Sequence, residues 1–177
     1  MEKTLQELII EQNVMLLGPE LWIAGAALVL LMIGAFAGER SSTQVTGLSM
    51  AALIAAFIGL LFSDTRGEAM NGAFIMDDFA WFMKLMVLGG SALALVLSVN
   101  FMRRENIMNF EFPILVLTAT LGMMLMISAN DLIALYMGLE LQSLSLYVLA
   151  AINRTSVRST EAGLKYFISG SFISGVF

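Results

Sequence analysis

The stretch LIALYMGLELQSLSLYVLAAI, residues 132–152, contains a single charged side chain, Glu140. About twenty predominantly apolar residues are enough for a helix to cross a bilayer. The sequence therefore predicts a membrane-spanning helix with a carboxyl group near its middle. A charged side chain at that depth costs about 2.5–3.5 kcal/mol on translocon scales, so residues of this kind usually have a function.

The composition supports the same fold class over the whole chain. Of the 177 residues, 59% are hydrophobic and 13% are charged, which is typical of an all-α polytopic membrane protein built as a helical bundle. Cys and His are both absent, which excludes disulfides, thiolate or imidazole metal ligation and Cys/His nucleophilic catalysis. We therefore expect no cofactor in this chain. The net charge of −5 and the lack of a basic face argue against nucleic acid as a partner.

The apolar blocks predict five complete spans and the beginning of a sixth within a single membrane domain. The predicted spans are residues 19–37, 44–62, 78–101, 112–129, 131–152 and 161–177. Because an apolar stretch runs up to Phe177, we expect the chain to belong to a longer protein.

Residues that favour helix starts and ends lie at the boundaries of these spans. Proline suits the first turn of a helix, acidic and amide side chains suit the N-cap, and glycine suits a helix end. The residues that fit these rules are Pro19, Gly38, Asp77, Asp78, Pro113, Asn130 and Asp131. The very short connection at Asn130 predicts a tight antiparallel pair of helices.

Positive charges in the short loops predict the orientation. Lys3 and Arg66 lie on one side, and the other side carries Arg40, Arg103, Arg104, Arg154 and Arg158. The arginine-rich side should be cytoplasmic, which places the N-terminus in the periplasm. The first eighteen residues do not resemble a secretory signal, and residues 5–16 have the weak pattern of an interfacial amphipathic helix.

Glu140 belongs to a polar stripe along its predicted helix. Tyr136, Glu140, Ser143 and Tyr147 fall within an arc of about 60°. The stripe could line water or hydrogen-bonded side chains, as in a proton path. The alternative is a carboxyl group that is hydrogen-bonded across a helix interface and holds two spans together.

Two lysines lie inside predicted spans. Lys84 shares a face with Leu88, Ser91, Leu95 and Ser98, and it could either extend to the interface or have a function.

Lys165 shares a face with Glu161 in the favourable i, i+4 order, so it is either a functional group or half of an ion pair at a helix start. Glu140 lies about 19 Å from the nearby cytoplasmic loop and Lys165 about 6 Å. A direct salt bridge between them is therefore not expected, and a deeper basic partner for Glu140 should lie beyond Phe177.

The remaining features indicate packing. Gly163, Gly170 and Ser174 share one face of the last segment and suit close contact with another helix. Trp22 and Trp81 lie near predicted span ends, where aromatic residues often mark the membrane interface.

Two motifs carry a family resemblance: GLELQSLSLYVLAA at residues 138–151 and RSTEAGLKYFISG at residues 158–170. With LGPELWIAGAALVLLMIGAF (17–36) and TLGMMLMISANDLIALYMGLE (120–140), the chain resembles the subunit N family of the proton-pumping NADH:quinone oxidoreductase, the bacterial respiratory complex I. The related subunits M and L and the Mrp-type antiporters carry a Glu at the corresponding place, but an aromatic residue precedes it.

The resemblance implies an antiporter-like subunit fold with inverted helix repeats. It implies that Glu140 is the fifth-helix glutamate of proton translocation and that Lys165 is the lysine of the KYF motif. Lys84, Tyr136, Ser143, Tyr147 and Glu161 are candidate accessory residues. The expected location is the bacterial inner membrane, with other membrane subunits of complex I and the bilayer as partners. NADH, FMN, Fe–S clusters and quinone would bind in other subunits.

Two other functions are open from the sequence. The chain could be a purely structural membrane subunit, in which Glu140 only donates or accepts a hydrogen bond. It could also belong to a stand-alone antiporter for a monovalent cation and protons.

Overall fold

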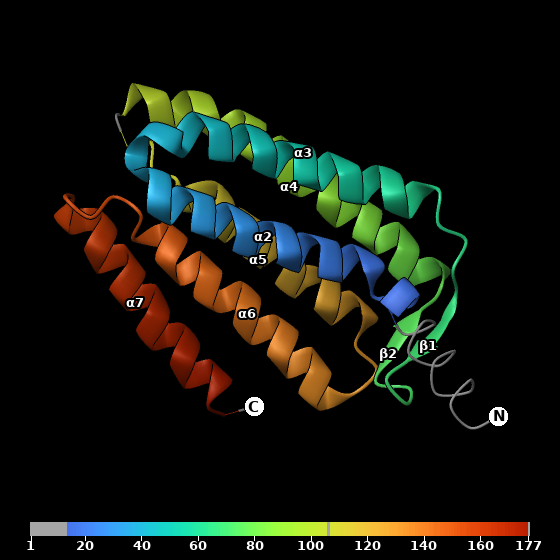
Figure 1. Ribbon diagram of the computed structural model, residues 1–177. Helices are drawn as coiled ribbons and strands as arrows, with labels where there is room; N and C mark the ends of the chain where they lie inside the picture. Colours follow the sequence, from blue (N-terminus) through green and yellow to red (C-terminus); the bar gives the residue numbers. More distant parts are fainter. Residues whose placement is uncertain (1–13, 106, 177) are drawn as a thin grey trace.

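The computed structural model describes residues 14–105 and 107–176 and shows a bundle of six long helices (Figure 1). In chain order the elements are α2 (Gly18–Ala37), η1 (Gly38–Ser41), α3 (Ser42–Leu61), β1 (Gly67–Ala69), β2 (Phe74–Met76), α4 (Asp78–Arg104), α5 (Glu111–Ser128), α6 (Leu132–Ala150) and α7 (Val157–Ser174). Five of the helices, α2 to α6, are long and apolar enough to cross a membrane. The amphipathic helix expected at residues 5–16 falls largely outside the described residues.

The helices run side by side along one direction. Helices α2, α3, α4 and α5 pack around a shared core, α6 packs closely on α5, and α7 lies outermost against α6 (Figure 1). The core side chains with no exposed surface are Ile23, Val45, Leu53, Leu60, Leu88, Leu95, Leu117 and Met124. Large apolar side chains also cover the outside of the bundle, for example Phe36 and Phe62 at 85% and 81% exposure. An apolar outer surface of this kind suits contact with lipid.

Several local signals have the predicted structural effect. Asp77 caps α4 by accepting a 2.7 Å hydrogen bond from the backbone N–H of Ala80. Asp131 caps α6 through the N–H of Ile133 at 3.4 Å. Gly38 ends α2 with a φ of 67°, a conformation that glycine adopts without steric cost. The indoles of Trp22 and Trp81 both donate to carbonyl groups of α3, so these residues also join helices.

The end of α4 and the start of α7 differ from the sequence expectation by three or more residues, whereas the other bounds of α2 to α6 differ by at most two. Helix α4 continues to Arg104, because a helix can extend past its apolar part when its last turn is solvated and carries basic residues. Helix α7 begins at Val157, four residues before the expected start at 161, because the side chain of Ser156 accepts a hydrogen bond from the N–H of Ser159.

A two-stranded hairpin joins α3 to α4 and was not predicted. Strands β1 and β2 pair antiparallel, and Met70, Asn71 and Gly72 in the turn have positive φ angles. The Asn71–Gly72 dipeptide is the signal that could have revealed it. Asn130 fixes the hairpin over the α5–α6 turn by donating from its side chain to the carbonyl of Gly72 and from its backbone to that of Ala73.

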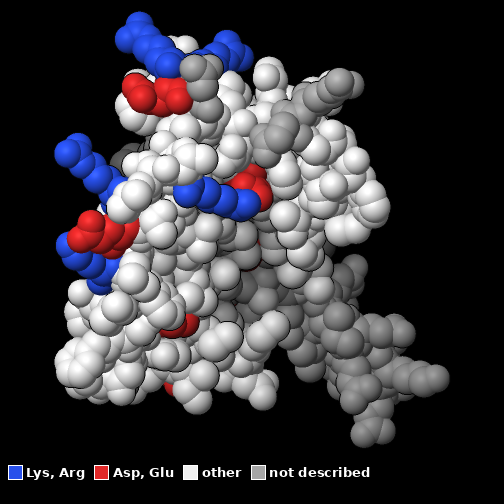
Figure 2. All heavy atoms as spheres, turned by 90° about the vertical axis from the view of Figure 1, so that its left-hand side faces the viewer, with Lys and Arg blue, Asp and Glu red and all other residues white. Residues whose placement is uncertain are grey.

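Charge is distributed unequally between the two ends of the bundle. Figure 2 looks onto the left-hand end of Figure 1 and shows basic and acidic side chains together there, on an otherwise uncharged surface. The C-terminus of α4 and the α6–α7 turn place Arg103, Arg104, Arg154 and Arg158 at this end. The opposite end, with the hairpin, carries Asp64, Glu68, Asp77, Asp78 and Asp131 together with Arg66. We call the first of these the arginine-rich end of the bundle and the second the acidic end.

Candidate functional site in α6 and α7

Glu140 lies in the middle of α6, and its side chain is partly buried against α7. The hydroxyl of Ser174 donates a 2.5 Å hydrogen bond to Oε2 of Glu140, and the hydroxyl of Tyr136 lies 3.3 Å from the same Ser174 oxygen. Tyr136 is one turn away from Glu140 on the same helix face. The carboxyl group therefore belongs to a three-residue hydrogen-bonded network between two helices.

Small residues bring α7 close enough to make this network. A methyl group added to Gly163 would lie 2.6 Å from Cβ of Ala151, and one added to Gly170 would overlap the ring of Tyr147. The face formed by Gly163, Gly170 and Ser174 thus contacts α6, which confirms the packing predicted for it.

The other side of α6 is held by α5. Gly122 and Gly138 face one another so closely that their backbones touch: a Cβ on Gly138 would lie 2.8 Å from the backbone nitrogen of Met126. The hydroxyls of Thr118 and Ser145 meet at 2.9 Å across the same interface. Because Gly138 is two residues from Glu140, the contact with α5 fixes the position of the carboxyl group.

The stripe of polar side chains expected on α6 has polar neighbours at one end only. Tyr136 and Glu140 share Ser174, and Ser143 is partly buried on the same helix. Tyr147 is 8% exposed and packs edge-on against Tyr166 and Phe167, with ring centroids 4.8 and 5.8 Å away. Hydrogen bonding at the carboxyl group thus gives way to aromatic packing toward the arginine-rich end.

Lys165 and Glu161 form an ion pair within α7. Their charged atoms are 2.5 Å apart, and the side chains are 74% and 56% exposed. Exposed pairs of this kind contribute about 0–1 kcal/mol to stability. Among the ion pairs of the described residues, Lys165 joins Glu161, and none includes Glu140.

Lys84 does not extend to the interface, and that reading of its side chain is wrong. It is 1% exposed and forms an ion pair with Glu20 of α2, which is 4% exposed. Its Nζ also donates to the sulfur of Met76 at 3.3 Å. Helices α3 and α5 pack on α4, and Glu20 of α2 contacts the amine, so the lysine side chain is enclosed within the bundle.

Glu20 is the functional candidate that the sequence reasoning missed. Its place in the first turn of α2 is that of a group at a span end, so the sequence alone does not single it out. Glu20 is in fact the more buried of the two carboxyl groups. A signal was present, because Glu20 and Lys84 carry opposite charges and lie within two turns of the same end of the bundle.

The described residues contain no cluster of three or more acidic side chains that could hold a metal ion. The candidate residues form three groups: the Glu140 network, the Lys165–Glu161 pair and the Glu20–Lys84 pair. Each of the three contains at least one carboxyl or amino group, a kind of group that can bind and release a proton.

Known proteins show a consistent similarity to this chain. A family model described as NADH:quinone oxidoreductase/Mrp antiporter, TM matches residues 129–177, which include Glu140 and Lys165. NADH-quinone oxidoreductase subunit N 1 of Rhizobium meliloti is 58% identical over 158 residues, and subunit N of Bartonella bacilliformis is 49% identical over 172 residues. These alignments cover 89% and 97% of this chain.

A solved structure has the same fold. A chain of respiratory complex I from Thermus thermophilus superposes with a TM-score of 0.72 at 28% identity, over 89% of this chain and 34% of that one. The two subunit N proteins are matched over 33% and 35% of their length, so the chain spans about a third of the curated relatives. The chain is therefore an all-α membrane protein homologous to the N-terminal third of NADH-quinone oxidoreductase subunit N.

Proposed function

We propose that this protein is a membrane subunit of the NADH:quinone oxidoreductase that takes part in proton translocation coupled to electron transfer from NADH to quinone. The observation that carries the proposal is the Glu140 carboxyl group, which lies in the middle of a membrane-spanning helix and is hydrogen-bonded to α7. An acid at this depth is retained at a cost, and such residues mark ion and proton pathways.

The described residues suggest a role for each group. Glu140 would bind and release the proton, while Ser174 and Tyr136 hold its carboxyl group at the α6–α7 interface. Lys165 lies in the third turn from the N-terminal end of α7, nearer the arginine-rich end, where its charge would act on the proton through space. Redox events elsewhere in the complex would reach Glu140 as a shift between two arrangements of these charges.

The same proposal gives an orientation and partners. By the positive-inside rule the arginine-rich end would face the cytoplasm, and the acidic end would face the periplasm together with the N-terminus. The protein would lie in the bacterial inner membrane beside other membrane subunits of complex I. NADH, FMN, Fe–S clusters and quinone would be bound by other subunits.

The decisive experiment replaces Glu140 by glutamine in the assembled complex. Glutamine has nearly the same shape and can accept the Ser174 hydrogen bond, but it cannot release a proton at this place. In inverted membrane vesicles, we expect the proton gradient per NADH oxidised to fall while the complex still assembles. Glu105→Gln, which removes an exposed acid at the arginine-rich end, is the matched control and should pump normally.

Two further variants separate this function from a purely structural one. Ser174→Ala removes the hydrogen bond to Glu140, and Ser174→Thr restores a hydroxyl. A positioning role predicts weaker pumping in the first variant and recovery in the second. If Glu140→Gln pumps normally and only Glu140→Leu disturbs assembly, the carboxyl group is a structural hydrogen-bonding group, and the proposal is refuted.

A further inference from the structure

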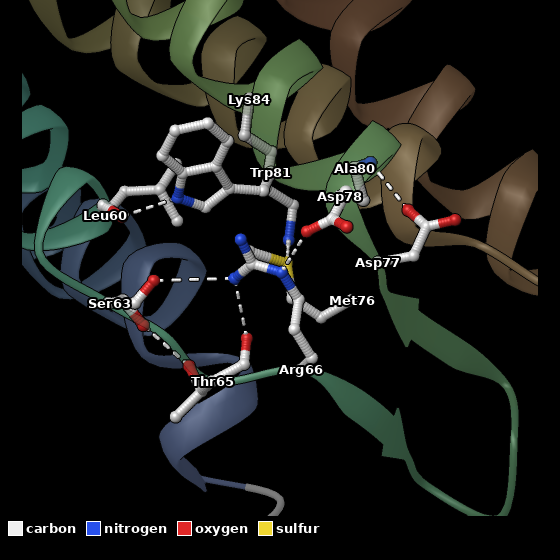
Figure 3. A network of polar contacts seen from close by, with 10 residues as sticks. All are labelled: Leu60, Ser63, Thr65, Arg66, Met76, Asp77, Asp78, Ala80, Trp81 and Lys84. Carbon is white, nitrogen blue, oxygen red and sulfur yellow. Dashed lines mark hydrogen bonds and ion pairs between the residues drawn. The ribbon is translucent and has the colours of Figure 1, made fainter.

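The Glu20–Lys84 ion pair is the most deeply buried pair of charges in the described residues. The two side chains are 4% and 1% exposed, and they join α2 to α4. Figure 3 shows the Lys84 amine beside the Met76 sulfur. The function proposed above uses neither Glu20 nor Lys84.

Stability does not account for this pair. A buried ion pair loses so much hydration that replacing both partners with well-packed apolar residues is often neutral or stabilising. The ammonium contacts Oε1 of Glu20, and no other described group donates to either oxygen of this carboxylate. Oε2 of this carboxylate therefore has a free position at which it can accept a proton or a hydrogen bond.

Few other charged side chains lie on the helices around the pair. Helix α3, which packs against both α2 and α4, contains no charged residue. Asp77 and Asp78 lie at the start of α4, and Arg66 forms a 2.8 Å ion pair with Asp78 at the exposed end (Figure 3). Lys84 is therefore about 9 Å along α4 from the acidic end of the bundle.

We propose that Glu20 and Lys84 form a second proton-exchange site, which transfers protons between the aqueous phase at the acidic end and the interior of the membrane domain. The inference rests on the proposed function, because it adds a site to the same translocation. Titratable pairs inside a membrane characteristically mark such relays.

The pair can move one proton in three steps and return to its starting state. A proton from the acidic end binds the Glu20 carboxylate, which leaves a neutral acid beside the Lys84 ammonium. The ammonium then releases a proton inward and becomes a neutral amine. Proton transfer from the acid to the amine restores the ion pair, with one proton moved in total. The reverse order moves a proton outward.

Lys84→Arg tests this step in the whole complex. Arginine keeps the positive charge and the ion pair, but its guanidinium does not lose a proton in proteins. We expect the variant to assemble and oxidise NADH, and to lose most of the proton gradient formed per NADH. Normal pumping by this variant would show that the pair acts only through its charge, and would overturn the proposal.

A second variant is used if arginine does not fit the site. Glu20→Gln/Lys84→Met removes both charges together and leaves no buried ion unpaired. Loss of pumping in an assembled double variant supports the proposal, whereas normal pumping, or failure to assemble, assigns the pair to folding and overturns it. Asp78→Asn, which removes an acid 93% exposed at the same end, is the control and should leave pumping unchanged.

Glu140→Gln in the same vesicles distinguishes the two proposals. If Glu140→Gln stops pumping and Lys84→Arg does not, only the second site is refuted. If Glu140→Gln pumps normally, the proposed function itself fails.

Discussion

The backbone contact between α5 and α6 predicts that adding a single methyl group at Gly138 disturbs the candidate site. The new Cβ of Gly138→Ala would lie 2.8 Å from the backbone nitrogen of Met126 and 2.9 Å from the carbonyl oxygen of Gly122. Ordinary contact begins at 3.4 Å, so the two backbones must separate by about 0.6 Å. Neither neighbouring atom is the end of a flexible side chain, so rotamer changes cannot relieve the clash.

The magnitude follows from two opposing effects. Alanine in place of a helical glycine stabilises by about 0.8–1 kcal/mol where there is room. Inserting a methyl group into a packed interface costs about 1–3 kcal/mol. Gly25→Ala in α2 is the matched control, because its Cβ would meet no atom within 4 Å. The free energies of unfolding of the two variants should therefore differ by about 1–3 kcal/mol, with Gly138→Ala the less stable.

The assay combines stability with pumping. Denaturant unfolding of the purified protein in detergent gives the stability difference, and the proton gradient per NADH in vesicles reports on Glu140, two residues away from Gly138. A displacement approaching 1 Å at a reacting group can reduce its rate about 100-fold. If Gly138→Ala is as stable as Gly25→Ala and pumps normally, α6 moves freely against α5, and the close contact does not position Glu140.

Two other substitutions test the energetics of the bundle. Lys84→Met leaves the Glu20 carboxylate buried without its partner, so we expect the free energy of unfolding to fall by about 3–5 kcal/mol. Adding Glu20→Gln should recover most of that loss. If the single variant is as stable as the double variant, the buried ion pair is contradicted. Asp77→Ala removes the cap of α4 and should lower the free energy of unfolding by about 0.5–2 kcal/mol, measured by thermal or denaturant unfolding. Asp78→Ala, at an exposed side chain, should lower it less. Equal effects of the two variants would rule out the capping role of Asp77.

Much of the candidate site could be predicted from the sequence. Glu140 stands out because it interrupts an apolar stretch, and helical periodicity places Tyr136 on its face. The small residues Gly163 and Gly170 indicate a close helix contact before any partner is known. Their contact with α6 and the hydrogen bond from Ser174 then follow from packing that the structure reveals.

The hairpin and the environment of the lysines could not be derived in the same way. Both strands have only three residues, too few to show an alternating pattern, and Asn130 holds the hairpin from a distant part of the chain. Lys84 and Lys165 look alike in sequence, since each lies one to two turns inside a predicted span. One is buried in an ion pair and the other is largely exposed.

The sequence by itself determined that this protein is a membrane bundle, where its helices begin and end to within a few residues, and that Glu140 lies deep in an apolar helix. These properties depend on local composition, periodicity and capping, which act over a few residues. Only the tertiary structure decided that Glu20 meets Lys84 and that Ser174 meets Glu140. Burial and charge pairing depend on helices far apart in the chain, and their side chains become neighbours only when the bundle packs.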